Sequence, residues 1–256
     1  MEFGLAPVQS HANFDAMRAQ ATLAESLGFR TLWVHEHHSQ RMMYPDPLMA
    51  LAVLAPVARE IGLGTNMLLL PIHHPLRVAG AAAMLDVLSN GRLRLGVANG
   101  YSASDLRAFG MLGEHRGNRL EQGLSLIRRL WQGDCVSQKG EGFDLQAFEL
   151  FPLPIQRPNP PIYVGGHAKI AIERAARLGD EYLISTTQKL GEIPALVQSY
   201  HEALGACGKK TRQPTLNRIV CVVDSAARKR QAETFFAKAL LALYDSWGHE
   251  LSLIHI

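Results

Sequence analysis

Residues 31–35 read TLWVH, a near-continuous apolar run that predicts a buried β-strand. Before it, residues 13–27 carry apolar side chains on one helical face, and Gly28 follows as a helix-ending residue. Further along the chain, GLGTNMLLL (62–70), RLRLGVA (92–98) and PIYVGG (161–166) predict more strands, with helical periods between them. Strands that are apolar on both faces are typical of a parallel sheet covered by helices, so we expect an α/β fold.

Seven strand–helix units follow one another along the chain. We expect strands at 2–8, 31–35, 62–70, 92–98, 161–166, 181–186 and 215–224, and helices at 13–27, 47–59, 78–88, 118–131, 168–178, 193–207 and 226–247. Between residues 131 and 161 the sequence is rich in Gly, Pro and Gln and has no clear period, which predicts an insertion or a hairpin. An open doubly wound sheet and a TIM-type (β/α)8 barrel with one unit missing are the two candidate architectures.

The composition sets broad limits on the class of protein. With 256 residues, 47% hydrophobic side chains and a mean hydropathy of −0.01, the chain falls in the globular class. Its 26 Lys and Arg residues are scattered and nearly balanced by 23 Asp and Glu, so we expect no nucleic-acid partner. The sequence contains no long apolar run and begins with a predicted strand, which favours a cytoplasmic protein without membrane contact. Its three cysteines are too widely spaced for a CxxC pair.

Polar or glycine-rich turns follow four successive predicted strands. They read Glu36-His37-His38, Pro71-Ile72-His73-His74-Pro75, Asn99-Gly100-Tyr101-Ser102 and Gly165-Gly166-His167. In both candidate architectures ligands bind outside the carboxyl ends of the strands, so these turns are where a site is expected.

An organic cofactor explains these turns better than a metal does. The sequence has no HExxH motif, and His37 and His38, as neighbours at a strand end, should point in opposite directions, so we expect no metal site. Glycines at 96–100 and 165–166 suit close approach of the backbone to a phosphate, although ordinary βα turns use glycine too. Asn66 interrupts an apolar strand, and its amide requires either backbone partners or a heterocycle with complementary edges.

Four motifs together resemble the bacterial luciferase-like flavin-dependent monooxygenase family. They are AESLGFRTLWVHEHH (24–38), LGTNMLLLPIHHPLR (63–77), LDVLSNGRLRLGVANGYSASDLRAFG (85–110) and RPNPPIYVGG (157–166), in the family's order and spacing. In addition, FFAKALLALYDSW (235–247) resembles the helix before the mobile loop of luciferase α subunits.

This resemblance implies a TIM-type barrel that binds reduced flavin mononucleotide (FMN) and uses O₂ as co-substrate. His37 would be the catalytic residue that assists proton transfer. The resemblance also implies a non-prolyl cis peptide in the strand that contacts the flavin ring, which would fall at Asn66-Met67 in this chain. The cofactor-binding residues it implies, including the phosphate contacts, are Asn66, Met67, Asn99, Gly100, Tyr101, Gly166 and His167.

Two departures from the family stand out. Many relatives have Arg at the position of Asn99, and Arg grips a phosphate bidentately where Asn cannot; His167 could supply part of that charge. Family chains continue beyond the helix near Trp247 with an eighth strand, whereas this one ends HELSLIHI. We therefore expect one luciferase-like barrel domain over residues 1–250, incomplete at its C-terminus, and a non-native tail over 251–256 that resembles translated adapter sequence.

The resemblance implies oxygenation of a small organic substrate, aldehyde-like or another apolar carbonyl. The alternatives are a hydride-transfer oxidoreductase that uses reduced deazaflavin, a flavin-binding homologue without catalysis, and a metal-dependent hydrolase built on His37, His73 or His74. Expected partners are a separate flavin reductase that supplies reduced flavin and a second copy in a homodimer, with a heterodimer as the other possibility.

Overall fold

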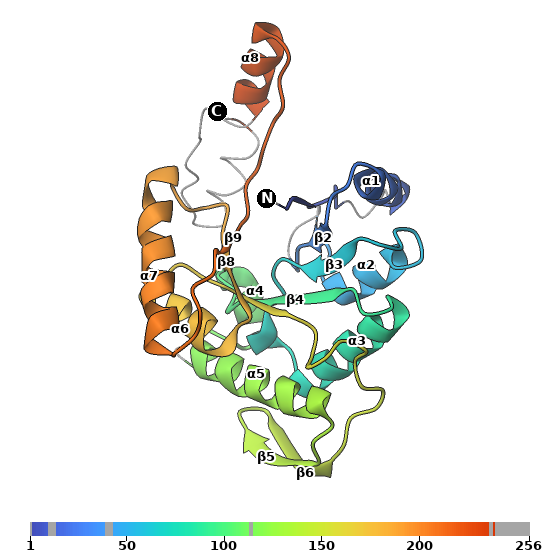
Figure 1. Cartoon of the computed structure of the whole chain (residues 1–256), viewed down its shortest axis with the longest axis vertical. Coiled ribbons are helices and arrows are strands. Elements are labelled where there is room, and N and C mark those ends of the chain that lie inside the picture. Colours follow the sequence, from blue (N-terminus) through green and yellow to red (C-terminus); the bar gives the residue numbers. More distant parts are fainter. Residues whose placement is uncertain (1, 10–13, 39–42, 113–114, 236–237, 239–256) are drawn as a thin grey trace. The chain divides into compact units, whose positions relative to one another are not determined.

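The computed structural model describes residues 2–9, 14–38, 43–112, 115–235 and 238 (Figure 1). The chain divides into two compact units. One consists of residues 1–164 with 178–180, and the other of residues 165–177 with 181–256. Each unit is a stretch of the α/β pattern that the sequence predicts.

The first unit contains a parallel sheet whose strands run in the order β1-β2-β3-β4-β7. These strands are β1 (Gly4–Leu5), β2 (Thr31–Val34), β3 (Gly62–Thr65), β4 (Leu93–Val97) and β7 (Ile162–Gly165). In register, Thr31 lies beside Gly62, Leu63 beside Leu93 and Leu95 beside Ile162. Every residue of β2, β3 and β7 is buried, which explains their apolar sequences.

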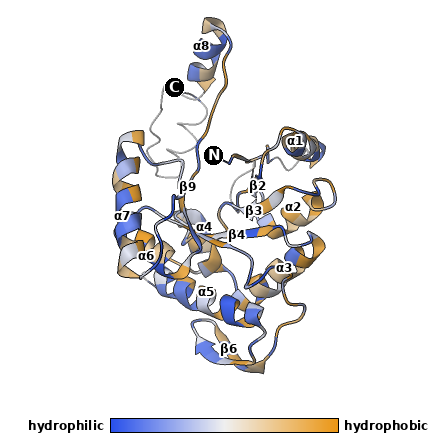
Figure 2. Cartoon of the chain, in the orientation of Figure 1, coloured by the Kyte–Doolittle hydropathy of each residue, from blue (hydrophilic) through white to orange (hydrophobic). Residues whose placement is uncertain are grey.

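Helices of the first unit cover this sheet. They are α1 (Phe14–Ser26), α2 (Pro47–Leu54), η1 (Leu70–Ile72), α3 (Pro75–Leu88), α4 (Ala103–Ala108) and α5 (Arg116–Gln132). The amphipathic pattern predicted for residues 118–131 is confirmed, because Leu120, Leu124 and Trp131 are buried while α5 keeps a hydrophilic side (Figure 2). The indole Nε1 of Trp131 donates to the carbonyl of Ala79 at 3.0 Å and so fixes α5 on α3.

The aperiodic segment between α5 and β7 contains a hairpin, as the sequence suggested. Its strands β5 (Val136–Gly140) and β6 (Phe143–Phe148) pair antiparallel. After the hairpin, the chain is held against α3 by Asp86, which is fully buried. The Asp86 carboxylate accepts from the backbone N–H groups of Ile155 (2.8 Å) and Gln156 (3.0 Å).

The second unit continues the strand–helix alternation. It contains α6 (Lys169–Leu178), β8 (Glu181–Ile184), η2 (Leu190–Glu192), α7 (Ile193–Ala206), β9 (Thr215–Leu216) and α8 (Ala226–Phe235). β8 and β9 pair in parallel, with Leu183 beside Thr215. The Tyr182 hydroxyl donates to the carbonyl of Gly166 at 2.7 Å and ties the start of α6 to β8.

Several predicted elements change length in the structure. The strand expected over 62–70 stops at Thr65, the one over 215–224 stops at Leu216, and α4 was not predicted. The helix expected to reach residue 247 is described only to Phe235, and its remainder and the tail 251–256 lie outside the described residues. A single domain over residues 1–250 stays a prediction.

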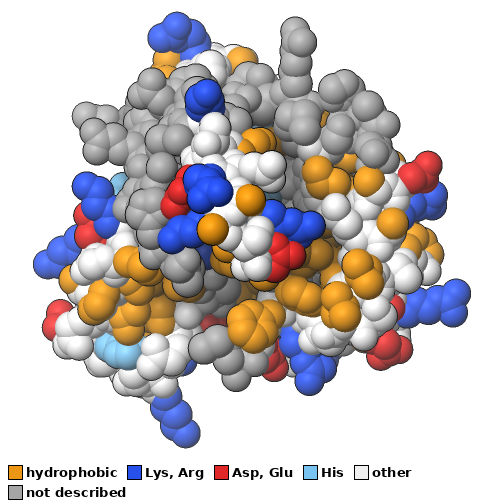
Figure 3. Space-filling model, turned by 90° about the horizontal axis from the view of Figure 1, so that it is seen from above, with side chains coloured by type: hydrophobic (Ala, Val, Ile, Leu, Met, Phe, Trp, Pro, Cys, Tyr) orange, Lys and Arg blue, Asp and Glu red, His pale blue; other side chains and the backbone are white. Residues whose placement is uncertain are grey.

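The surface of the described residues agrees with the composition. Cys135, Cys207 and Cys221 are exposed free thiols. On the face drawn in Figure 3, Lys and Arg side chains lie scattered among acidic and hydrophobic ones. Within the described part of the chain, every helix is too short or too polar to span a membrane.

Candidate active site at the carboxyl ends of β2, β3 and β4

Three neighbouring parallel strands bring most of the predicted site residues to one edge of the first unit. β2 is followed by His35 to His38, β3 by Asn66 and Met67, and β4 by residues 98–101. After β3 the chain bends toward β4, since the N–H of Leu68 donates to Gly96 O (2.8 Å) and Leu68 O accepts from Ala98 N (3.0 Å). The residues that follow these three strands therefore lie at one edge of the sheet, and a shared cofactor site there stays a prediction.

The peptide bond between Asn66 and Met67 is cis and non-prolyl, which confirms the prediction made from the resemblance. Next to it, the hydroxyl of Thr65 donates to Gly96 O (2.7 Å) and accepts from Gly96 N (2.9 Å). A Cβ on Gly96 would lie 2.0 Å from the carbonyl oxygen of Thr65 and 3.1 Å from the sulfur of Met67. Glycine is thus required for β4 to approach this turn.

Asn66 is buried, and part of its amide is satisfied by a residue that the sequence did not single out. Its Nδ2 lies 3.4 Å from His35 Nε2, and His35 Nδ1 lies 2.9 Å from Gln9 Oε1. Burial, and then the charge of His37, lower the pKa of His35 to about 4, so its ring is neutral near pH 7. A neutral ring that donates to Gln9 and accepts from Asn66 leaves the Asn66 oxygen as the polar atom available to a ligand.

His37 lies in a partly buried position against Tyr101, with ring centroids 5.9 Å apart. Burial lowers its pKa, while the carboxylates of Asp105 and Glu36 act in the opposite direction. Asp105, on the first turn of α4, is itself buried, and its Oδ2 has no hydrogen-bond partner in the described structure. His37 is therefore a neutral imidazole whose protonated form would be stabilised by two acidic neighbours.

Asn99 and Gly100 follow β4 in a turn that combines a left-handed glycine with an unsatisfied amide. Gly100 has φ +73°, and its carbonyl accepts from Arg116 Nη1 at 2.9 Å. Asn99 Oδ1 is buried and finds no hydrogen-bond partner among the described residues. Buried polar atoms normally have partners, so an orphan here suits a ligand that brings a donor, such as a hydroxyl group. Arg116, at the first position of α5, adds a cation beside this turn that the sequence analysis had missed.

Gly166 and His167 belong to the second unit, so whether they share a site with the residues above stays a prediction. Gly166 has φ +142°, and a Cβ there would lie 2.6 Å from the Cβ of Ala171, which accounts for the glycine. His167 is exposed, just before α6.

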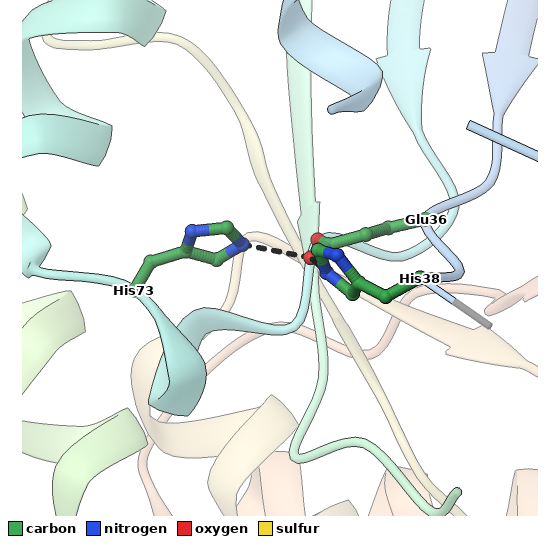
Figure 4. A group of neighbouring side chains, drawn as sticks. All are labelled: Glu36, His38 and His73. Atoms are coloured by element: carbon green, nitrogen blue, oxygen red, sulfur yellow. Dashed lines mark hydrogen bonds and ion pairs between the residues drawn. The ribbon is translucent and has the colours of Figure 1, made fainter. Parts of the chain in front are cut away.

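The side chains of Glu36, His38 and His73 form a cluster (Figure 4). The Glu36 carboxylate is buried, and its Oε1 lies 2.7 Å from His38 Nε2 and 2.8 Å from His73 Nε2. Its Oε2 accepts from Leu69 N at 2.8 Å. Burial raises the pKa of Glu36, but the hydrogen bonds from the two histidines outweigh it and leave that pKa lowered; the bond to Glu36 raises the pKa of His38.

The sequence predicted only part of this cluster. Alternation along an extended segment puts Glu36 and His38 on one side and His37 on the other, as expected for strand-end neighbours. The metal-dependent alternative named His37, His73 or His74 and neither Glu36 nor His38. In the structure His74 instead caps α3, with its Nδ1 accepting from Leu76 N at 3.3 Å.

The chain is similar in sequence to curated enzymes that are named flavin-dependent and F420-dependent. The chain is 36% identical over 169 residues to the oxygenase component of flavin-dependent trigonelline monooxygenase from Acinetobacter baylyi, covering 65% of this chain and 47% of that protein. It is 32% identical over 192 residues to an F420-dependent hydroxymycolic acid dehydrogenase from Mycobacterium tuberculosis, covering 70% and 52%. The chain spans about half the length of these curated relatives.

The fold is similar to that of a solved monooxygenase, RslO1 from Streptomyces bottropensis. The TM-score is 0.83 at 25% identity, and the match covers 96% of this chain and 79% of that structure. The family model described as luciferase-like monooxygenase matches residues 1–250. The α/β half-barrel, its strand-end turns and this match together show that the chain belongs to the luciferase-like monooxygenase family.

Proposed function

We propose that this chain is the oxygenase component of a two-component flavin-dependent monooxygenase. It would use reduced FMN and O₂ to oxygenate a small organic substrate, aldehyde-like or another apolar carbonyl. One observation carries the proposal: the ends of β2, β3 and β4 bring a neutral histidine, His37, to the same edge as two amides, Asn66 and Asn99. The relation to trigonelline monooxygenase supports it.

Two side-chain amide oxygens at this edge fit a flavin, and that of Asn99 is buried without a partner among the described residues. The oxygen of Asn66 can accept from an N–H on the edge of a heterocyclic ring, and the buried oxygen of Asn99 can accept from a sugar-chain hydroxyl. Met67 would supply an apolar, polarizable contact for the ring. Gly100 and Tyr101 would line the turn, with Arg116 close enough to contribute positive charge toward a phosphate. Gly166 and His167 complete the proposed cofactor-binding set.

Reduced FMN, when bound, would supply the electrons that activate O₂. The protein's own contribution is proton control at His37. Because burial lowers its pKa, the imidazole is neutral near pH 7, and its unprotonated nitrogen can accept a proton from a reacting group. Asp105 and Glu36 would stabilise the imidazolium that results, and the ring of Tyr101 meets that of His37 edge-on.

The partners proposed for the whole protein follow from this chemistry. A separate flavin reductase would supply reduced FMN, since the A. baylyi relative is named as an oxygenase component. We also propose a homodimer, which the family resemblance favours, and a cytoplasmic location, which the globular composition favours.

A second function has its own support. The M. tuberculosis relative is named F420-dependent, and a deazaflavin also has a heterocyclic ring and a hydroxylated side chain that would suit Asn66 and Asn99. The chain would then transfer a hydride between reduced deazaflavin and its substrate, without a need for O₂.

Cofactor titration separates the two functions. The purified chain would be titrated anaerobically with reduced FMN and, separately, with reduced deazaflavin, and air then admitted while oxygen uptake is recorded. The substrate panel would contain straight-chain aldehydes, cyclic ketones and trigonelline.

The main proposal requires reduced FMN to bind and a panel member to incorporate one atom of ¹⁸O₂, with His37→Ala losing turnover and His74→Ala keeping it. Deazaflavin binding with substrate reduction and no oxygen uptake would replace it by the second function. Flavin binding without turnover of any panel member would favour a homologue without catalysis.

A further inference from the structure

The cluster of Glu36, His38 and His73 takes no direct part in the proposed cofactor contacts. One ligating atom from each residue lies within 4.8 Å of the other two, and no second group of three such side chains occurs in the described ranges. The three residues come from two turns, and the ring of His73 points at Glu36 and His38 from the opposite side (Figure 4).

The cluster has the supports expected of a ligand set. Leu69 N–H holds Glu36 Oε2, so the carboxylate offers its other oxygen alone. The Glu36 side chain is fully buried, whereas the side chains of His38 and His73 are 19% and 28% exposed. An ion could therefore enter from the histidine side while the carboxylate stays fixed.

We propose that Glu36, His38 and His73 form a binding site for a divalent transition-metal ion, with Zn²⁺ as the ion whose ligand preference fits best. Two imidazole nitrogens and one carboxylate oxygen are a common three-residue zinc set, with the fourth position left to water. The hard cations Ca²⁺ and Mg²⁺ prefer oxygen ligands and are poorly served by two nitrogens.

The ligand atoms would have to shift to accept the ion. Ligands of a tetrahedral Zn²⁺ with bonds of about 2.0–2.1 Å lie about 3.3 Å apart. The present N···O distances are 2.7 and 2.8 Å, so each ring would withdraw from the carboxylate by about half an ångström. The ligand atoms of the two histidines lie within 4.8 Å of each other and would settle at the same tetrahedral spacing. Each Nε2–H now donates a hydrogen bond to Glu36. On metal binding the proton moves from Nε2 to Nδ1 through solvent, so Nε2 is free to coordinate the ion and the ring stays neutral.

Zinc titration of the untagged 256-residue chain tests the site without any flavin. The three exposed cysteines are first alkylated, because thiolates would also bind zinc. After chelator dialysis, Zn²⁺ is added in competition with a chromophoric chelator. We expect one equivalent to bind, and His38→Ala and His73→Ala each to raise the Kd at least about tenfold. His74→Ala, one residue away and outside the cluster, should leave the Kd unchanged.

A second readout reports ligand geometry. Co²⁺ bound in place of Zn²⁺ should give the intense visible absorption of a four-coordinate ion, and His73→Ala should abolish it while circular dichroism shows that the variant is folded. Absence of stoichiometric zinc binding, or binding that survives both histidine substitutions, would overturn the proposal. Because flavin is absent from the assay, either outcome is independent of the proposed monooxygenase function.

Discussion

The buried carboxylate of Glu36 accepts the main-chain N–H of Leu69 at 2.8 Å, a hydrogen bond that ties the end of β2 to the turn after β3. The same carboxylate accepts from two histidines, so all its partners are donors. Glu36 therefore joins the segments that carry His37 and Asn66, and several properties of the chain depend on it.

Replacement of Glu36 by Gln should destabilise the fold strongly. The amide offers one acceptor and one donor to three donors, so at least one buried N–H loses its partner. We expect the free energy of unfolding to fall by about 2–4 kcal/mol in urea denaturation. Glu173→Gln, on the exposed face of α6, is the matched control and should change stability by less than about 0.5 kcal/mol. Equal effects of the two substitutions would contradict the role given to Glu36.

His35 should make stability depend on pH in the acid range. Its pKa is about 4 in the folded chain, against about 6.5 when unfolded, so the unfolded chain binds a proton first as pH falls. Stability should therefore drop between about pH 6.5 and pH 4, by about 3 kcal/mol from this group. Urea unfolding across this range measures it. His35→Gln should flatten that part of the profile, and an unchanged slope would show that another group is responsible.

The proton-transfer role proposed for His37 predicts the shape of the pH–activity curve. Since burial lowers its pKa, the acid limb of kcat/KM should fall below pH 6.5, where the imidazole becomes protonated. His37→Ala should lower kcat/KM by about 10²–10⁴-fold and remove that limb, while leaving the Kd for reduced FMN within a few-fold. An acid limb that persists in His37→Ala would assign it to another group.

Two glycine-to-alanine substitutions should act in opposite directions. A Cβ on Gly96 would lie 2.0 Å from the carbonyl oxygen of Thr65, so Gly96→Ala should cost at least about 2 kcal/mol or prevent folding. Gly205, in α7, has open space around its Cβ position, and Gly205→Ala should stabilise the chain by about 0.5–1 kcal/mol. Thermal unfolding of both variants checks the signs.

Much of the fold could be predicted because its elements repeat a simple period. The apolar face of residues 118–131 and the apolar run at 31–35 each specify an element by themselves. The run 62–70 misled the prediction, because an apolar stretch cannot distinguish a strand from a turn followed by a 3₁₀ helix. In the structure Leu68 forms an isolated bridge with Val97 of β4, and Pro71 lies within η1. The helix α4 has only six residues, too few to show a helical period.

The candidate site was predictable where it depends on strand ends and not where it depends on long-range contacts. His37, Asn66 and Asn99 follow strands directly, so parallel topology brings them together. The contact of His73 with Glu36 spans 37 residues, and that of Arg116 with Gly100 joins a helix start to a turn. No periodic pattern in the sequence indicates either contact, so both become visible only in the folded chain.

The exposed thiols are sites for spectroscopic labels, between which a distance can be measured. Cys135 lies in the first compact unit and Cys207 in the second. Once Cys221 is replaced by Ser, a pair of spin labels or fluorophores on the remaining two would report the distance between the units in solution. The same labels would register whether reduced flavin changes the distance between Cys135 and Cys207, with one conservative substitution.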